Sequence, residues 1–205
     1  PAQYIDKPIA KSDIEQLLEA ANWAPTHKKT EPWRFKVLQG ESQEKLGLFL
    51  SLKYMENDSK PKEFKVKKLI ENPKKAGAII AICMQRDPNE SIPEWEEIAA
   101  TAMAVQNMWL CCTEMGIGCY WSSPGLTKYM DEFFEMNEGE KCLGFFCVVG
   151  QCFHVFGILK VNICCCFFMA MDKKRNNSIR HFRCLNFLIS ICYEKRQTLT
   201  FKIYL

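Results

Sequence analysis

Twelve residues, from Ala24 to Phe35, hold most of the side chains in this chain that could touch a ligand. The stretch reads APTHKKTEPWRF, and His27 is the only histidine of the first 150 residues. A connection that only joined a helix to a strand would be short and rich in Gly, Asn, Asp or Ser. This one is long, basic and aromatic, which suits a loop that binds a flat, anionic ligand. The alternative is a structured loop in which Trp33 and Phe35 complete the hydrophobic core.

The composition sets limits on the class of protein. A chain of 205 residues with 48% hydrophobic side chains fits one domain, or one domain with an appendage. The net charge is only +3 and no basic stripe dominates, so nucleic acid is not the expected partner. No apolar stretch reaches the roughly 18 residues of a membrane span, and no signal peptide is visible. We therefore expect a cytoplasmic protein without a membrane partner.

Cysteine usage divides the chain near residue 150. Half of the 12 cysteines lie before that point, singly or inside apolar runs, as reduced core thiols do. The other half lie beyond it, and Cys164, Cys165 and Cys166 are adjacent. Adjacent thiols do not easily ligate one metal, and no Cys-x-x-Cys pair faces another pair. The sequence therefore predicts no metal site.

The hydrophobic pattern of residues 1–150 predicts alternating helices and strands. A capping box at Ser12-Asp13-Ile14-Glu15 opens an amphipathic helix over 13–23, which Pro25 ends. Phe35 to Leu38 alternates like a half-buried strand. The remaining predicted elements are helices over 42–55, 61–72, 93–115 and 128–134, a fully buried strand over 76–84, and strands over 119–121 and 143–149.

The helix expected from Pro93 to about Met115 is apolar on nearly every side. Such a helix must be covered all round. In a domain of this size a second subunit is an economical cover, so the pattern predicts a homodimer. The alternative is a central helix buried within one chain.

Residues 151–205 differ from the rest of the chain. They are rich in Cys, Phe, Ile, Lys and Asn, and Asp172 and Glu194 are their only acidic residues. Their apolar clusters lack caps and turns, so they do not read as a layer of the domain. We interpret 1–150 as the domain and 151–205 as an anomalous tail, from a frameshift or read-through. The alternative is a genuine lineage-specific extension.

Three motifs, "EAANWAPTHKKTEPWRF", "EMGIGCYWSSPG" and "EKCLGFFCVVG", resemble the nitroreductase family of flavoproteins, in its small single-domain, YdjA-like branch. The resemblance covers about residues 1–150. It implies an α+β sandwich, with a mainly antiparallel sheet flanked by helices, built as an intertwined homodimer. It also implies an FMN-dependent NAD(P)H oxidoreductase that reduces nitroaromatics, quinones or similar acceptors by a ping-pong hydride mechanism. Because the flavin carries the chemistry, no catalytic side chain is expected.

The resemblance also assigns the cofactor contacts to two motifs. The matching residues are Trp23 and His27 in the first motif, and Tyr120, Trp121 and Ser122, with Ser123 as a weaker neighbour, in the second. His27 could instead order its own loop through a hydrogen bond, and the aromatic residues of the second motif could be strand-end core. The basic residues Lys28, Lys29 and Arg34 match no role, and the carboxylates read as caps and surface charges.

Two departures from the family pattern bear on the cofactor. The family's phosphate-binding Arg-Arg-Ser would fall a few residues before Pro1, so the N-terminus reads as truncated. After Gly150 the tail stands where the family has a Gly- and Arg-containing segment. Arg is the usual bidentate partner of phosphate, so we expect weak FMN binding. Alternative interpretations are a flavin-binding protein without turnover and an inactive fragment or wrongly assigned gene product.

Overall fold

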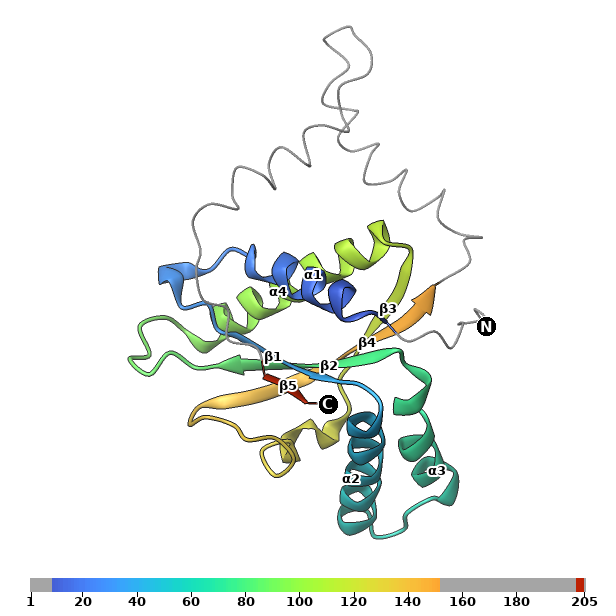
Figure 1. The fold of residues 1–205 in the computed structure, drawn as a ribbon. Coiled ribbons are helices and arrows are strands. Elements are labelled where there is room, and N and C mark those ends of the chain that lie inside the picture. Colours follow the sequence, from blue (N-terminus) through green and yellow to red (C-terminus); the bar gives the residue numbers. More distant parts are fainter. Residues whose placement is uncertain (1–8, 152–201, 205) are drawn as a thin grey trace, which may run out of the picture. The chain divides into compact units, whose positions relative to one another are not determined.

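The structure, a computed structural model, describes residues 9–151 and 202–204 (Figure 1). The helices of these residues are α1 (Lys11–Asn22), α2 (Glu41–Asn57), α3 (Glu63–Glu71) and α4 (Glu94–Glu114). The strands are β1 (Trp33–Leu38), β2 (Ala78–Gln85), β3 (Ile117–Ser122), β4 (Glu140–Gln151) and β5 (Lys202–Tyr204). Short 3-10 turns are η1 (His27–Lys29), η2 (Pro73–Lys75) and η3 (Gly125–Tyr129).

The strands form one sheet in the order β3-β4-β2-β1-β5. Neighbouring strands from β3 to β1 are antiparallel, and β5 pairs with β1 in parallel. The predicted α+β fold with a mainly antiparallel sheet is therefore confirmed. The β2–β4 register shifts between Ile82 and Cys83, which leaves Leu143 as an extra residue on β4.

Helices cover both faces of this sheet (Figure 1). On one face α1 and α4 bury the apolar side chains of Leu17, Leu18, Val105 and Met108. The amide of Asn107 on α4 also donates to the Ala20 carbonyl at 3.1 Å, which joins the two helices. On the other face α2 and the 125–136 segment contribute a second core, whose members include Leu46, Leu50, Met130 and Phe134.

The start of α1 differs from the prediction. The Ala10 carbonyl accepts from the backbone N–H groups of Asp13 and Ile14, at 3.0 and 3.2 Å, so Ala10 is the N-cap. No side chain caps this end, and Ser12 lies inside the helix. The predicted capping box is therefore wrong, because the buried Ile9 docks the chain before Ser12 is reached.

Two further predictions need correction. β1 is buried on both faces rather than half-buried, since Lys36 points into the second core and is itself buried. The helix expected over 128–134 is instead the turn η3 followed by hydrogen-bonded turns. Burial of Met130 and Phe134 fixes this segment against the sheet, so its irregular backbone serves packing rather than helix propensity.

The long helix α4 begins after Pro93, its N-cap, as the sequence predicts. One stripe of it is buried under α1 and against the sheet. Several large apolar side chains of α4 are nevertheless exposed in the single chain, namely Trp95, Ile98, Met103, Trp109 and Leu110. One chain alone therefore does not cover the helix, and the predicted homodimer stays a prediction.

The described cysteines are free thiols, as predicted. Two of them, Cys83 and Cys142, are register partners on β2 and β4. Cys83 donates a hydrogen bond to Cys142, which lowers the pKa of the Cys142 thiol and raises that of Cys83.

Of the predicted tail, only Gln151 and the backbone of β5 lie within the described residues. No helix in the described part of the chain is long and apolar enough to cross a membrane.

Candidate functional site

The loop between α1 and β1 is held in an unusual backbone conformation. Lys28, Lys29 and Glu31 have φ values of 50°, 56° and 42°, in the left-handed region that disfavours side chains. Each such residue costs about 1–2 kcal/mol relative to ordinary helical geometry. Strain of this kind persists where surrounding contacts impose it, and it clusters at ligand-binding sites.

Local hydrogen bonds account for part of this geometry. The Thr26 hydroxyl accepts from the backbone N–H of Glu31 at 3.2 Å and lies 3.2 Å from the Thr30 hydroxyl. The backbone N–H of Thr30 donates to the His27 carbonyl. The two threonines thus close the loop on itself and leave the side chains of His27, Lys28 and Lys29 exposed.

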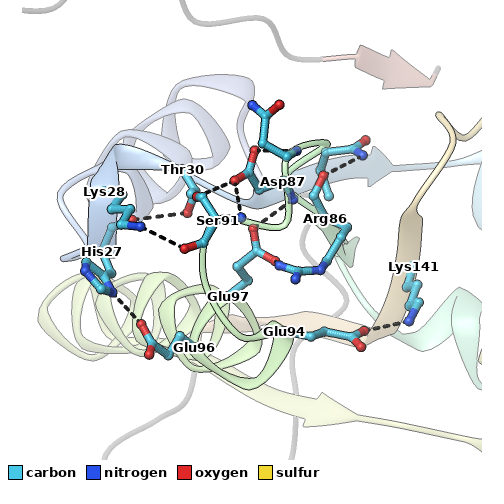
Figure 2. A network of polar contacts seen from close by, with 12 residues as sticks. His27, Lys28, Thr30, Arg86, Asp87, Ser91, Glu94, Glu96, Glu97 and Lys141 are labelled. Carbon is cyan, nitrogen blue, oxygen red and sulfur yellow. Dashed lines mark hydrogen bonds and ion pairs between the residues drawn. The ribbon is translucent and has the colours of Figure 1, made fainter.

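Contacts with the start of α4 hold the same loop from outside (Figure 2). The Nδ1 atom of His27 lies 2.6 Å from Oε2 of Glu96. Lys28 donates through Nζ to the carbonyl of Ser91 at 2.8 Å. Two successive loop residues are therefore tied to the first turn of α4 and to the segment that precedes it.

That segment is itself fixed by a buried carboxylate. Glu97 has no exposed surface; it is ion-paired with the Arg86 guanidinium and accepts from the backbone N–H of Asp87 at 2.9 Å. The Glu97 contact raises the pKa of Arg86. Ser91 donates to the Asp87 carboxylate through its hydroxyl and its N–H, which lowers the pKa of Asp87. The support beneath His27 is therefore a closed polar network.

The predicted carboxylate roles need correction at this point. Asp13 and Glu15 lie at the half-exposed and exposed surface of α1, but Glu97 is buried and Glu96 is bonded to a candidate site residue. Sequence reasoning missed Glu96, because a Glu in the first turn of a helix is expected for dipole reasons alone. No local signal joins it to His27, which is 69 residues earlier.

The other residues of the first motif divide between site and core. Trp23 follows α1, is exposed, and donates through Nε1 to Glu19 at 3.2 Å. Trp33 and Phe35 are buried in the core beneath α1 and α4, which confirms the alternative interpretation for these two side chains. Trp33 also donates to the Asn22 side chain at 3.0 Å and so anchors the end of α1.

The second motif lies on β3, the terminal strand of the sheet. Successive side chains of a strand point to opposite faces. Trp121 packs against the α1–α4 core, whereas Tyr120 bonds to Cys147, which belongs to the opposite core. Tyr120 is exposed and Trp121 half-buried, so the structure separates two residues that the sequence treats as one contact surface.

Gly144 on β4 explains how Trp121 fits. Its φ is +155°, and a Cβ built there would lie 2.4 Å from Nε1 of Trp121 and 2.7 Å from the Ser122 carbonyl oxygen. Only glycine therefore lets the indole lie against β4 beside the bulge. A glycine inside an apolar strand pattern is the one sequence signal that could have marked this close approach.

The two motifs lie at different levels along the sheet. Trp121 pairs with Phe146 of β4, whose partner Ile80 on β2 lies opposite Val37, near the end of β1. The first motif leads instead into the opposite end, where β1 begins at Trp33 and β2 ends. The start of α4 is tied to the same end, since Glu94 pairs with Lys141 of β4 at 2.6 Å. Trp23, His27 and Trp121 share the α1–α4 side of the sheet; Tyr120 does not, and Ser122 and Ser123 lie where β3 ends.

Comparison with known proteins agrees with this architecture. YdjA of Escherichia coli K12, provisionally named an NAD(P)H nitroreductase, is 30% identical over 134 residues, covering 64% of this chain and 72% of YdjA. A nitroreductase-like protein from Bacillus cereus superposes with a TM-score of 0.64 at 29% identity, over 75% of this chain and 81% of that one.

A nitroreductase from Bacteroides fragilis, solved with bound FMN, shares the fold at 17% identity, with a TM-score of 0.53 over 87% of this chain and 88% of that one. The model of the nitroreductase family matches residues 3–151, which include both motifs and every described element except β5. This chain belongs to the nitroreductase family.

Proposed function

We propose that this chain is an FMN-dependent oxidoreductase that takes hydride from NAD(P)H and reduces small acceptors such as nitroaromatics or quinones. The observation that carries the proposal is the strained, exposed loop of His27, Lys28 and Lys29, set within a family match over residues 3–151. Relatives named as NAD(P)H nitroreductases support the activity, and the FMN-bound Bacteroides fragilis structure supports the cofactor.

The side chains of the two motifs suit a flavin nucleotide. A flavin offers a flat aromatic ring, a polyhydroxyl chain and a phosphate, which need aromatic surface, hydrogen-bonding groups and cations respectively. Trp23 and Tyr120 expose about two-fifths of their surface, at 41% and 42%, and both rings are thus accessible for stacking. The proposed holding residues are Trp23, His27, Tyr120, Trp121, Ser122 and Ser123.

FMN, when bound, would accept hydride from the nicotinamide and pass electrons to the second substrate. The chain's own residues would bind and orient the ring. Trp121 would act mainly through its position, because its indole edge is already held against Gly144. His27 and the serines at the end of β3 would bond to polar atoms of the cofactor.

A second copy of the chain completes the proposal. The exposed apolar side chains of α4 include Trp109 and Leu110 toward its C-terminal half. An apolar helix face of this size is typical of a surface that another subunit covers. The proposed homodimer would bury this face and place each FMN in a cleft between subunits. Tyr120 of one subunit and Trp121 of the other would then be able to contact the same FMN.

One preparation tests cofactor and assembly together. The full chain is expected to elute from gel filtration at dimer mass, and with FMN in the column buffer the same peak should carry flavin absorbance above that of the buffer. It should then oxidise NADH or NADPH when a nitroaromatic or a quinone is supplied. Bound flavin without NAD(P)H oxidation would indicate a binding protein without turnover, and a peak with no flavin absorbance above that of the buffer would overturn the cofactor assignment.

A further inference from the structure

Glu96 is the residue of the site whose contact has a direct chemical consequence for ligand recognition. A carboxylate can only accept hydrogen bonds. With Nδ1 of His27 2.6 Å from Oε2 of Glu96, the hydrogen between them must sit on Nδ1. The hydrogen bond at one ring nitrogen of a histidine determines what the other nitrogen offers. In the neutral imidazole, Nε2 is then an acceptor.

The surroundings make this arrangement a fixed one rather than a chance surface contact. Glu96 precedes the fully buried Glu97, whose bonds to Arg86 and Asp87 immobilise the first turn of α4. His27 is restrained from its own side, because Lys28 is anchored to Ser91 and the loop backbone is closed by the two threonines. Both partners of the pair are therefore held independently.

Figure 2 shows that two neighbouring carboxylates of the first turn of α4 point to different partners. Glu96 is directed at the His27 ring, whereas Glu94 is directed away from it, to Lys141 at 2.6 Å. The two residues share the helix end and its dipole, and each makes one contact with a basic side chain at 2.6 Å. They differ in the partner they hold, and the Glu96 side chain is less exposed, at 24% against 42%.

We propose that Glu96 is a positioning residue that presents Nε2 of His27 as a hydrogen-bond acceptor, so that His27 recognises a donor of the flavin cofactor and not its phosphate. The fitting donors are a ribityl hydroxyl or the ring N–H, both of which riboflavin shares with FMN. A fully ionised phosphate offers acceptors alone, so it has no hydrogen to give to Nε2. This inference rests on the proposed function.

The first test reads the histidine directly and needs no cofactor. The chain has three histidines, so the signals of His27 in a nitrogen-15 spectrum are assigned by comparison with His27→Gln. The full chain should show the Nδ1–H form at His27. Glu96→Ala should move His27 toward the Nε2–H form that free histidine favours, while the matched control Glu94→Ala should leave it unchanged. An Nε2–H form in the unaltered chain would overturn the inference.

The second test compares the dissociation constants of FMN and riboflavin by flavin fluorescence. Loss of one hydrogen bond corresponds to about a three- to tenfold weaker affinity. His27→Ala and Glu96→Ala should weaken both flavins by about this factor, and Glu94→Ala should weaken neither. Weakening of FMN alone would assign His27 to the phosphate and overturn the inference.

The two proposals fail in distinguishable ways. If the unaltered chain binds neither flavin, the proposed function fails, and the tautomer measurement still decides whether Glu96 positions His27. If flavin binds and Glu96→Ala matches the control in both affinity and tautomer, the function stands and the positioning role is refuted.

Discussion

Two pairs of a carboxylate with a basic side chain, one on each side of the sheet, have nearly the same length and opposite surroundings. Lys36 and Glu140 lie 2.7 Å apart in the core beneath α2, with 7% and 1% of their side chains exposed. His27 and Glu96 lie 2.6 Å apart at the start of α4, with 58% and 24% exposed. Distance alone therefore does not tell what a pair does.

Exposure to solvent distinguishes the role of the buried pair from that of the exposed pair. Two charges taken out of water are strongly coupled, and loss of either partner strands the other in an apolar core. An exposed pair is screened and contributes between about 0 and 1 kcal/mol to stability. The buried pair consequently belongs to the fold, whereas the exposed pair stabilises little and is better explained by where it places His27.

The buried pair also has more partners. Lys36 donates to the Glu135 carbonyl at 3.3 Å and lies 5.9 Å from the centre of the Phe134 ring. Glu140 accepts from the backbone N–H of Asn137 at 3.1 Å. The pair thus fastens the turn before β4 to the middle of β1, which no apolar contact in this region would do with the same directionality.

The largest expected effect breaks this buried pair. Glu140→Ala leaves the Lys36 ammonium buried without its counter-charge, so the free energy of unfolding should fall by about 3–5 kcal/mol. Glu94→Ala removes an exposed pair of similar length and should cost no more than about 1 kcal/mol. Urea unfolding followed by tryptophan fluorescence measures both.

A combined replacement sharpens the result. Lys36→Met with Glu140→Leu removes both charges and restores apolar contacts, so it should recover most of the stability lost by Glu140→Ala. If Glu140→Ala and Glu94→Ala cost the same, the distinction between the two environments is wrong.

The two pairs also show what could and could not be predicted from the sequence. The long apolar runs that became β2, β4 and α4 were predicted because burial on both faces leaves a continuous signal. Lys36 was missed, because a lysine within an alternating strand pattern normally faces solvent. Its counter-charge is 104 positions later and the contact has no local trace.

The candidate site shows the same limit. Its residue types and loop were visible in the sequence, but the contact between His27 and Glu96 joins two segments that only the fold brings together. The division of Tyr120 and Trp121 between the two faces follows from strand alternation, which a motif treated as one contact surface does not resolve. The close approach of Trp121 to Gly144 depends on the register between β3 and β4, which the sequence alone does not show.

An intermediate effect is expected at Gly144 on β4. Gly144→Ala places a methyl group within 3 Å of the Trp121 indole and the Ser122 carbonyl, at a φ that side chains avoid. Overpacking and backbone strain should together lower the free energy of unfolding by about 2–3 kcal/mol. The fluorescence of the folded state should change as Trp121 is displaced.

Gly125 provides the matched control. It begins η3, has no atom within 4 Å of a built Cβ, and its φ lies outside the left-handed region. Gly125→Ala should therefore change the free energy of unfolding by less than about 0.5 kcal/mol. Equal effects at the two glycines would mean that the Trp121 contact does not constrain β4.

The smallest effect is expected in the strained loop and has the opposite sign. Lys29 has φ 56°, where a side chain costs about 1–2 kcal/mol, whereas glycine adopts this region freely and loses about 0.5–1 kcal/mol of chain entropy. Lys29→Gly should therefore leave the free energy of unfolding unchanged or raise it by up to about 1 kcal/mol. The same replacement inside a helix, Lys45→Gly in α2, should lower it by about 1 kcal/mol. Thermal unfolding of the two variants separates the cases: a loss at position 29 equal to that at position 45 would show that the loop carries no strain, and the exposed region would then lose its strongest structural mark of function.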